Sequence, residues 1–98
     1  MTDRELLDLA AKAAGVKHNP SLSAACRGER IWWNPLTDDG DALRLAVKLQ
    51  IDVDNDHPEC CVIPEPQVVE YYKNNNGDPY AATRRAIVRA AAEMGKSM

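Results

Sequence analysis

A dense polar cap followed by an apolar stripe, within residues 34–49, places the strongest constraint on how this 98-residue chain can fold. Side-chain oxygens at Thr37 or Asp38 can accept hydrogen bonds from the N–H groups that open a helix, and the nearby carboxylates suit its positive end. Apolar residues then recur at helical spacing: Ala42, Leu43, Leu45, Ala46 and Leu49. The segment therefore predicts a helix that begins near Thr37 or Asp38 and buries this stripe.

Two further helices are predicted at the ends of the chain. Thr2 and Glu5 fit a capping box, and Gly15 is expected to end the helix that follows. Its buried stripe is expected to contain Leu6, Leu7, Leu9, Ala10, Ala13 and Ala14. Asp78 caps the last helix, Pro79 fits its first turn, and Gly95 is expected to end it. The stripe expected there consists of Ile87, Val88, Ala91 and Met94, with Thr83 or Arg84 at its edge.

Segments rich in β-branched and aromatic residues predict strands at residues 30–33, 50–54, 60–63 and 67–72. Ile51 and Val53 would share one face and Asp52 and Asp54 the other, the pattern of a strand wetted on one side. Residues 55–58, 64–66 and 74–77 are expected to turn, and residues 16–28 to form a loop, in which residues 24–26 fit a helical turn or a strand equally. Trp32 and Trp33 would point to opposite faces, and which one is buried stays open.

The order of these elements predicts an α+β fold for residues 1–98 as one domain. Three helices would pack on a small, mainly antiparallel sheet of three to four strands, in α-β-α layers. Phe is absent and alanine abundant, so the helices are expected to approach closely. No apolar run approaches the roughly 20 residues that cross a bilayer, and residues 1–5 do not resemble a secretion signal. We therefore expect no membrane partner. The odd number of cysteines, three, favours a reducing cytosol as the place where the protein acts.

Charge is distributed unevenly along the chain. The net charge is −3, but residues 50–78 hold seven acidic side chains against Lys73, a local −6. Residues 79–98 hold four basic side chains against Glu93, a local +3. The simpler interpretation is a basic helix lying beside acidic strands, in which Arg89 pairs with Glu93 and the other arginines pair with the strands. The alternative is a charged surface that steers a partner.

The acidic and cysteine-containing segment offers two weak metal patterns. Asp52, Asp54 and Asp56 match the first ligands of a calcium loop, but His57 stands where the loop needs Gly and Ile63 where it needs Glu. His57, Cys60 and Cys61 suggest zinc, yet adjacent cysteines on a strand point to opposite faces. His18 and Cys26 could complete such a site only through the fold. We therefore expect no metal, with one of Cys60 and Cys61 buried and the other near the surface.

Catalysis and cofactor binding find no support in the sequence. A nucleophile would have to be Cys26 or Ser23, paired with His18 or His57, and no strained turn or oxyanion pattern accompanies them. All five glycines stand singly, so there is no phosphate-binding loop. We expect no catalytic residue, no cofactor and no enzymatic activity.

The candidate binding residues lie on the last helix and at Trp33. Arg85 and Arg89 are neighbours at i, i+4, and Arg84 flanks them, so this helix could engage an acidic protein surface or phosphates. The acidic chain and the small number of basic residues weigh against nucleic acid. Arg84, Arg85, Arg89 and Trp33 thus form a candidate surface for a protein partner.

Residues 33–43 read WNPLTDDGDAL and residues 78–91 read DPYAATRRAIVRAA. In these segments and in the opening helix at residues 2–15, the chain resembles small bacteriophage and prophage proteins with a phage ABA (α-β-α) sandwich domain, related more distantly to the NinX type. The resemblance covers roughly two thirds of the chain and leaves residues 17–29 and 52–76 unmatched. It implies a layered fold and a place in the cytoplasm of an infected bacterium. It implies no activity and no site residues.

The sequence therefore predicts a phage accessory protein that acts by contact with a host or phage protein, through which it could modulate a host process or a defence system. The alternative is a small nucleic-acid-binding regulator that uses the basic last helix. Periodicity treats packing within one chain and between two copies alike, so a homo-oligomer is compatible with either hypothesis.

Overall fold

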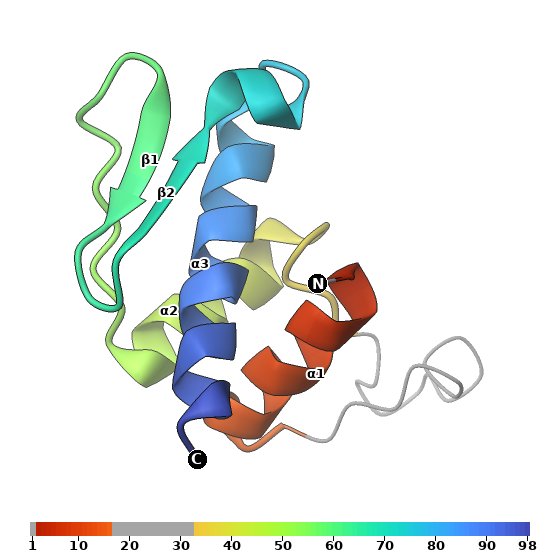
Figure 1. Cartoon of the computed structure of the whole chain (residues 1–98). Coiled ribbons are helices and arrows are strands. Elements are labelled where there is room, and N and C mark those ends of the chain that lie inside the picture. The colour runs from red at the N-terminus through yellow and green to blue at the C-terminus, as the bar shows by residue number, and fades with distance from the viewer. Residues whose placement is uncertain (1, 17–32) are drawn as a thin grey trace.

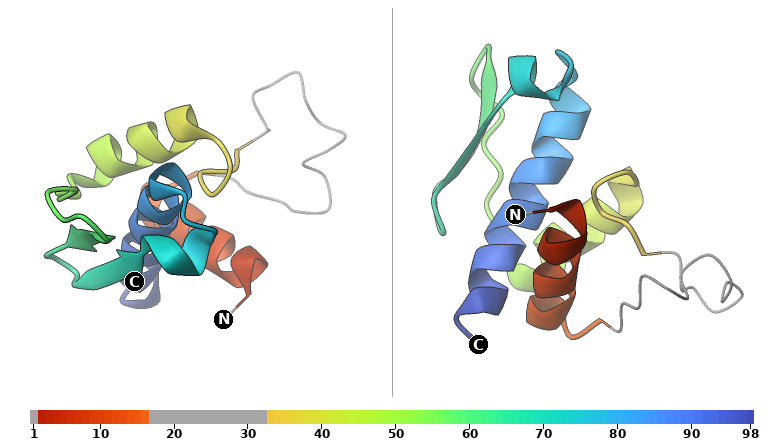
Figure 2. Two further views of the ribbon diagram at one scale, coloured as in Figure 1. Left: turned by 90° about the horizontal axis from the view of Figure 1, so that it is seen from above. Right: turned by 45° about the vertical axis from the view of Figure 1, so that its right-hand side comes forward.

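A long C-terminal helix forms the centre of the molecule, and the other elements surround it (Figure 1). The computed structural model describes residues 2–16 and 33–98. The elements in chain order are α1 (Asp3–Ala14), α2 (Asp39–Leu49), β1 (Cys60–Ile63), β2 (Val68–Tyr71), the short 3-10 helix η1 (Tyr72–Asn75) and α3 (Pro79–Lys96). Helix α3 lies between the β1–β2 hairpin and α1 (Figure 2). This part of the chain is therefore an α+β fold, in which three helices pack with a two-stranded antiparallel sheet.

The polar residues that begin each helix have the predicted roles. Glu5 N–H donates to the Thr2 hydroxyl (3.1 Å), and Thr2 N–H donates to the Glu5 carboxylate (2.8 Å), which completes the capping box of α1. Asp38 accepts from the N–H of Asp41 (2.7 Å) at the start of α2. Asp78 accepts from the N–H of Tyr80 (2.9 Å) at the start of α3. All three predicted helix starts are confirmed.

In residues 2–16 and 33–98 the sheet has two strands, against the three to four predicted for the chain. β1 and β2 pair antiparallel, with Cys60 opposite Tyr71 and Ile63 opposite Val68. The strand expected at residues 50–54 is wrong, since only Asp54 pairs, in one bridge to Val62. Gln50 ends α2 in a left-handed conformation (φ 57°), and the chain turns away before a strand can form. The predicted loop at residues 17–28, the strand residues 30–32 and Trp32 lie outside the described residues, and Trp33 is not in a strand.

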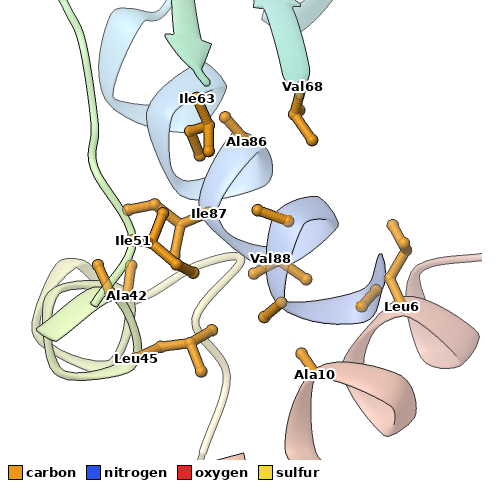
Figure 3. Packing of buried hydrophobic residues seen from close by; sticks show 14 of the residues in the cluster. Leu6, Ala10, Ala42, Leu45, Ile51, Ile63, Val68, Ala86, Ile87 and Val88 are labelled. Atoms are coloured by element: carbon orange, nitrogen blue, oxygen red, sulfur yellow. The ribbon is translucent and has the colours of Figure 1, made fainter. Parts of the chain in front are cut away.

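The buried apolar residues of all elements meet around α3. Ala86, Ile87 and Val88 of α3 lie at the centre of this cluster, and side chains from the hairpin, from α2 and from α1 point towards them (Figure 3). Within the described ranges the cluster is rich in alanine, including residues that are fully buried. Small side chains let helix axes approach, so the expected close packing of Ala-lined helices is confirmed for α1 and α3.

Gly95 does not end α3 as predicted. The helix continues to Lys96, and Gly95 is buried in its last turn against α1. A Cβ atom at this position would lie 2.1 Å from the carbonyl oxygen of Leu9 and 2.9 Å from its carbonyl carbon. Glycine is therefore needed here because two helix backbones approach too closely for any side chain.

Candidate functional site

The three arginines proposed as a binding surface each pair with a carboxylate of a different element. Arg84 donates from Nε to the carbonyl oxygen of Leu36 (2.9 Å) and from Nη1 to the Asp39 carboxylate (2.6 Å) at the start of α2. Arg85 donates to the Asp3 carboxylate in the first turn of α1 (3.0 Å). These contacts brace α3 against both other helices.

Arg89 pairs with the acidic strand. Its guanidinium donates to the carboxylate of Glu70 on β2 and to the carbonyl oxygen of Val69 (3.3 Å). Glu70 is only 8% exposed, and the Asn75 amide also donates to it (3.0 Å). The predicted pair between Arg89 and Glu93 is wrong, because Lys96 holds Glu93 instead (3.1 Å).

The simpler interpretation of the charge pattern therefore holds in outline and fails in detail. A basic helix does lie beside an acidic strand, and Arg89 makes that contact. Arg84 and Arg85 pair with the helices α2 and α1 rather than with strands. Arg85 and Arg89 line one polar pocket together with Glu93 and Lys96, and Arg84 lies outside it.

Trp33 is half-buried and packs against the apolar cluster at the approach to α2. The turn that follows it is tied to α2 by its own side chains. Asn34 accepts from the N–H of Leu36 (3.0 Å) through its side-chain oxygen, and its backbone N–H donates to the buried carboxylate of Asp41 (2.9 Å). Asp41 in turn accepts from Arg44 (2.8 Å). The polar residues of the segment WNPLTDDGDAL thus serve to start and orient a helix.

An apolar groove of about 580 Å³ lies between α2, the first half of α3 and residues 53–55. Two large apolar side chains on its walls are mostly exposed, Leu43 at 64% and Tyr80 at 69%. We name this groove, with all its lining residues, the α2/α3 groove. Besides Leu43 and Tyr80 its lining consists of Asp39, Ala42, Ala46, Val53, Asn55, Tyr72, Pro79, Thr83, Arg84 and Ile87. Asn55 fixes one wall, since its amide donates to the Thr83 hydroxyl on α3 (2.8 Å).

Leu43 was predicted to be buried, and this prediction is wrong. Successive residues of a helix are about 100° apart, so Leu43 is turned well away from the side of α2 on which Ala42, Leu45 and Ala46 are buried. Tyr80 was not included in any predicted surface. It lies seven residues before Ile87, two helical turns, and so extends the face of Ile87 beyond the edge of the core. The seven-residue spacing between Tyr80 and Ile87 was therefore the sequence signal that could have predicted an exposed apolar side chain at Tyr80.

The cysteine and carboxylate candidates have structural environments. Cys61 is buried and Cys60 half-buried, as the alternation along a strand predicted. Burial raises the pKa of the Cys61 thiol, which keeps it protonated at neutral pH. The pKa of the exposed Asp54 is lowered, first by the Asp56 N–H (2.9 Å) and then by His57 (3.2 Å). Residues 2–16 and 33–98 contain no group of three His, Cys, Asp or Glu side chains placed to hold a metal ion, and His18, Ser23 and Cys26 lie outside these ranges.

Comparisons with protein-family models, with curated proteins and with solved structures found no match to this chain. Within the described part of the chain, none of the helices has both the length and the apolar character that crossing a bilayer requires.

Proposed function

We propose that this chain is a bacteriophage or prophage accessory protein, with a domain of the phage ABA sandwich type, that acts through contact with another protein in the cytoplasm of an infected bacterium. The layered α-β-α arrangement of that family is part of the proposal. Its support is the resemblance in residues 33–43, which lead into α2 and form its first residues, and in residues 78–91, which cap α3 and form most of it. The proposed mode of action is binding rather than catalysis.

The observation that carries the binding function is the exposure of Leu43 and Tyr80 on the walls of an apolar groove. Apolar surface left in water costs about 25 cal/mol per Å² relative to burial, so covering this groove would favour association. Exposed apolar patches mark protein-interaction sites and ligand-binding grooves, and the exposure of two large side chains on the rim is the feature that favours a protein. We therefore propose the α2/α3 groove, whose lining includes Arg84, as the contact surface in place of Arg85 and Arg89.

The contacts of the arginines favour protein binding over the nucleic-acid alternative. A phosphate that approached Arg84, Arg85 or Arg89 would compete with a carboxylate already held by each guanidinium. It would also approach a chain of net negative charge. Both effects weaken a role for α3 as a phosphate-binding helix.

The proposed function is tested by capturing partners from lysate of a susceptible bacterium with the tagged protein. Leu43→Ser and Tyr80→Ser should each remove at least nine tenths of the specifically captured protein. Tyr71→Ser is the matched control, because Tyr71 is also an exposed tyrosine (42%) but lies on β2 outside the groove lining. Capture that both groove variants leave unchanged would refute the proposal, and so would retention of DNA or RNA at low salt that Arg85→Glu abolishes.

A further inference from the structure

We propose that Asn76 is a site of spontaneous modification, at which the backbone nitrogen of Gly77 displaces ammonia from the side-chain amide, and that the fold controls the rate. Of the six asparagines in the chain, Asn76 is the one that glycine follows. Both residues are exposed at the end of η1. Glycine has no Cβ atom, so no side chain shields the Gly77 nitrogen from its neighbour.

The reaction closes a five-membered ring and then opens it with water. The Gly77 nitrogen gives up its proton and bonds to Cγ of Asn76, while the bond from Cγ to Nδ2 breaks and the amide group leaves with that proton as ammonia. Water then adds to one of the two ring carbonyl carbons. Opening at Cγ gives aspartate, and opening at the backbone carbonyl gives isoaspartate, whose main chain is one methylene longer. The sequence consumes one water and needs no redox partner.

In the folded chain the attacking nitrogen is held away from the amide. Gly77 N–H donates to the carbonyl oxygen of Tyr72 (2.8 Å), and Asp78 N–H donates to that of Asn75 (3.0 Å). Asn76 is left-handed, with φ 59° and ψ 26°. Ring closure requires the Gly77 nitrogen to eclipse Cβ of Asn76 about the Cα–C bond, and at this ψ it is turned away from Cβ. The turn therefore has to open before the ring can close.

Opening of this turn is a local event. Residues 73, 74, 76 and 77 are exposed, so their movement uncovers little apolar surface. The loss consists mainly of the two backbone hydrogen bonds, each of which should slow the reaction by about fivefold. Asn75 also holds the turn, since its amide donates to the Glu70 carboxylate (3.0 Å) and to the Tyr71 carbonyl oxygen (2.9 Å). The fold should therefore slow the reaction by at least about tenfold relative to the unfolded chain.

The modification would act at one end of the α2/α3 groove. Tyr72 precedes the turn, Pro79 and Tyr80 follow it, and all three line the groove. The added methylene of isoaspartate would change the connection between these residues, whereas aspartate would change only the charge. The reaction itself does not depend on the proposed binding function.

Mass spectrometry after incubation at mildly alkaline pH tests both parts of the proposal. Trypsin releases residues 74–84 as one peptide, whose fragment ions assign the change from amide to acid to a single asparagine. In guanidinium chloride, Asn76 should react severalfold faster than Asn74 and Asn75, the matched controls within the same peptide. Without denaturant, reaction at Asn76 should be at least about tenfold slower than with it.

Three variants separate the chemistry from its control by the fold. Gly77→Ala places a side chain beside the attacking nitrogen and should slow the reaction severalfold in denaturant, where folding does not matter. Asn75→Ala removes the hydrogen bonds to Glu70 and Tyr71, so it should speed the reaction about fivefold in the folded protein and leave the rate in denaturant unchanged. Asn74→Ala, the matched control, alters an exposed asparagine of the same loop and should change neither rate. Circular dichroism establishes that Asn75→Ala and Asn74→Ala are folded.

Three results would overturn the proposal. Loss of ammonia from Asn74 or Asn75 as fast as from Asn76 in denaturant would show that glycine does not direct the reaction. Equal rates at Asn76 with and without denaturant would show that the fold exerts no control. An unchanged rate in folded Asn75→Ala would show that the hydrogen bonds of this turn do not hold the nitrogen away from the amide.

Discussion

Replacing Gly95 with alanine tests the closest contact in the fold. The added Cβ atom would lie 2.1 Å from the Leu9 carbonyl oxygen and 3.3 Å from the Leu9 Cα atom. These are backbone atoms of α1, so no side-chain rotation can relieve the overlap. The two helices must instead separate, and the alanines packed between them would lose contact. The substitution should therefore destabilise the whole α1–α3 interface.

The size of the effect follows from two opposing contributions. Overpacking a tight interior by one methyl group costs about 1–3 kcal/mol, and more where backbone has to move. Alanine regains at most about 1 kcal/mol of helix propensity, and less in a last turn such as this one. Because the overlap is with backbone atoms, the cost should lie near or above the upper end of its range, which leaves a net loss of about 2–3 kcal/mol. For a domain of this size that corresponds to a melting temperature lower by roughly 8–20 °C.

Urea unfolding followed by circular dichroism measures this loss, with Gly40→Ala as the control. A Cβ atom at Gly40 would meet only the ends of two side chains, Arg44 and Asp38, at 3.2 Å. Arg44 can shift, whereas the Asp38 oxygen also caps α2, so the gain in helix propensity and the loss at the cap oppose each other and Gly40→Ala should change stability by less than about 1 kcal/mol in either direction. A Gly95→Ala protein as stable as the wild type would refute the close approach of α1 and α3.

Three further predictions concern the ion pairs, the exposed leucine and the pH dependence. Arg89→Ala leaves the buried Glu70 without its cation and should lower the free energy of unfolding in urea by about 1–3 kcal/mol. Arg85→Ala breaks a more exposed pair and should lower it by less than about 1 kcal/mol. Equal losses in the two variants would contradict this difference in burial. Leu43→Ser should cost less than about 1 kcal/mol, against roughly 2–5 kcal/mol for truncation of a buried leucine. The pKa of Glu5 is lowered by hydrogen bonds from the capping box, so its stabilisation is complete above its ordinary value of 4.5 and is lost as pH falls through the folded pKa. Glu5→Gln should therefore show a smaller drop in melting temperature between neutral and acidic pH than the wild type does, and an unchanged drop would exclude this contribution.

The helices were predictable because their signals are local. The capping groups of Thr2, Asp38 and Asp78 act within three residues of themselves, so sequence spacing alone reveals them. The hairpin was predictable for the same reason, since β-rich segments flank a proline-containing turn. The strand expected at residues 50–54 failed because alternation describes which residues face water, not whether a neighbouring strand is present. Ile51 is buried and Asp52 exposed, as predicted, without a ladder.

The candidate site was not predictable, because it depends on what lies opposite each helix face. Helical periodicity shows that Arg84, Arg85 and Arg89 lie near one another, but their partners come from α2, α1 and β2, far away in the sequence. The same applies to Gly95, whose partner is the backbone of Leu9. A glycine near the end of a helical pattern predicts a terminus, and only the fold shows that it is instead a point of contact.

The most conspicuous polar segment and the least conspicuous leucine have opposite roles for this reason. Asn34, Asp38 and Asp41 form hydrogen bonds with one another's backbone and with nearby groups, so their chemistry is used in holding the turn against α2. Leu43, two residues further on, is exposed although it is apolar, and it faces a groove in which Tyr80 is exposed as well. A side chain whose surroundings contradict its chemistry indicates a function more strongly than one whose bonds are already made within the fold. In the described part of the chain that criterion selects Leu43, Val47, Tyr71, Tyr80 and Met98. Of these five, Leu43 and Tyr80 line one groove together, and this is the physical basis for proposing the α2/α3 groove as the binding surface.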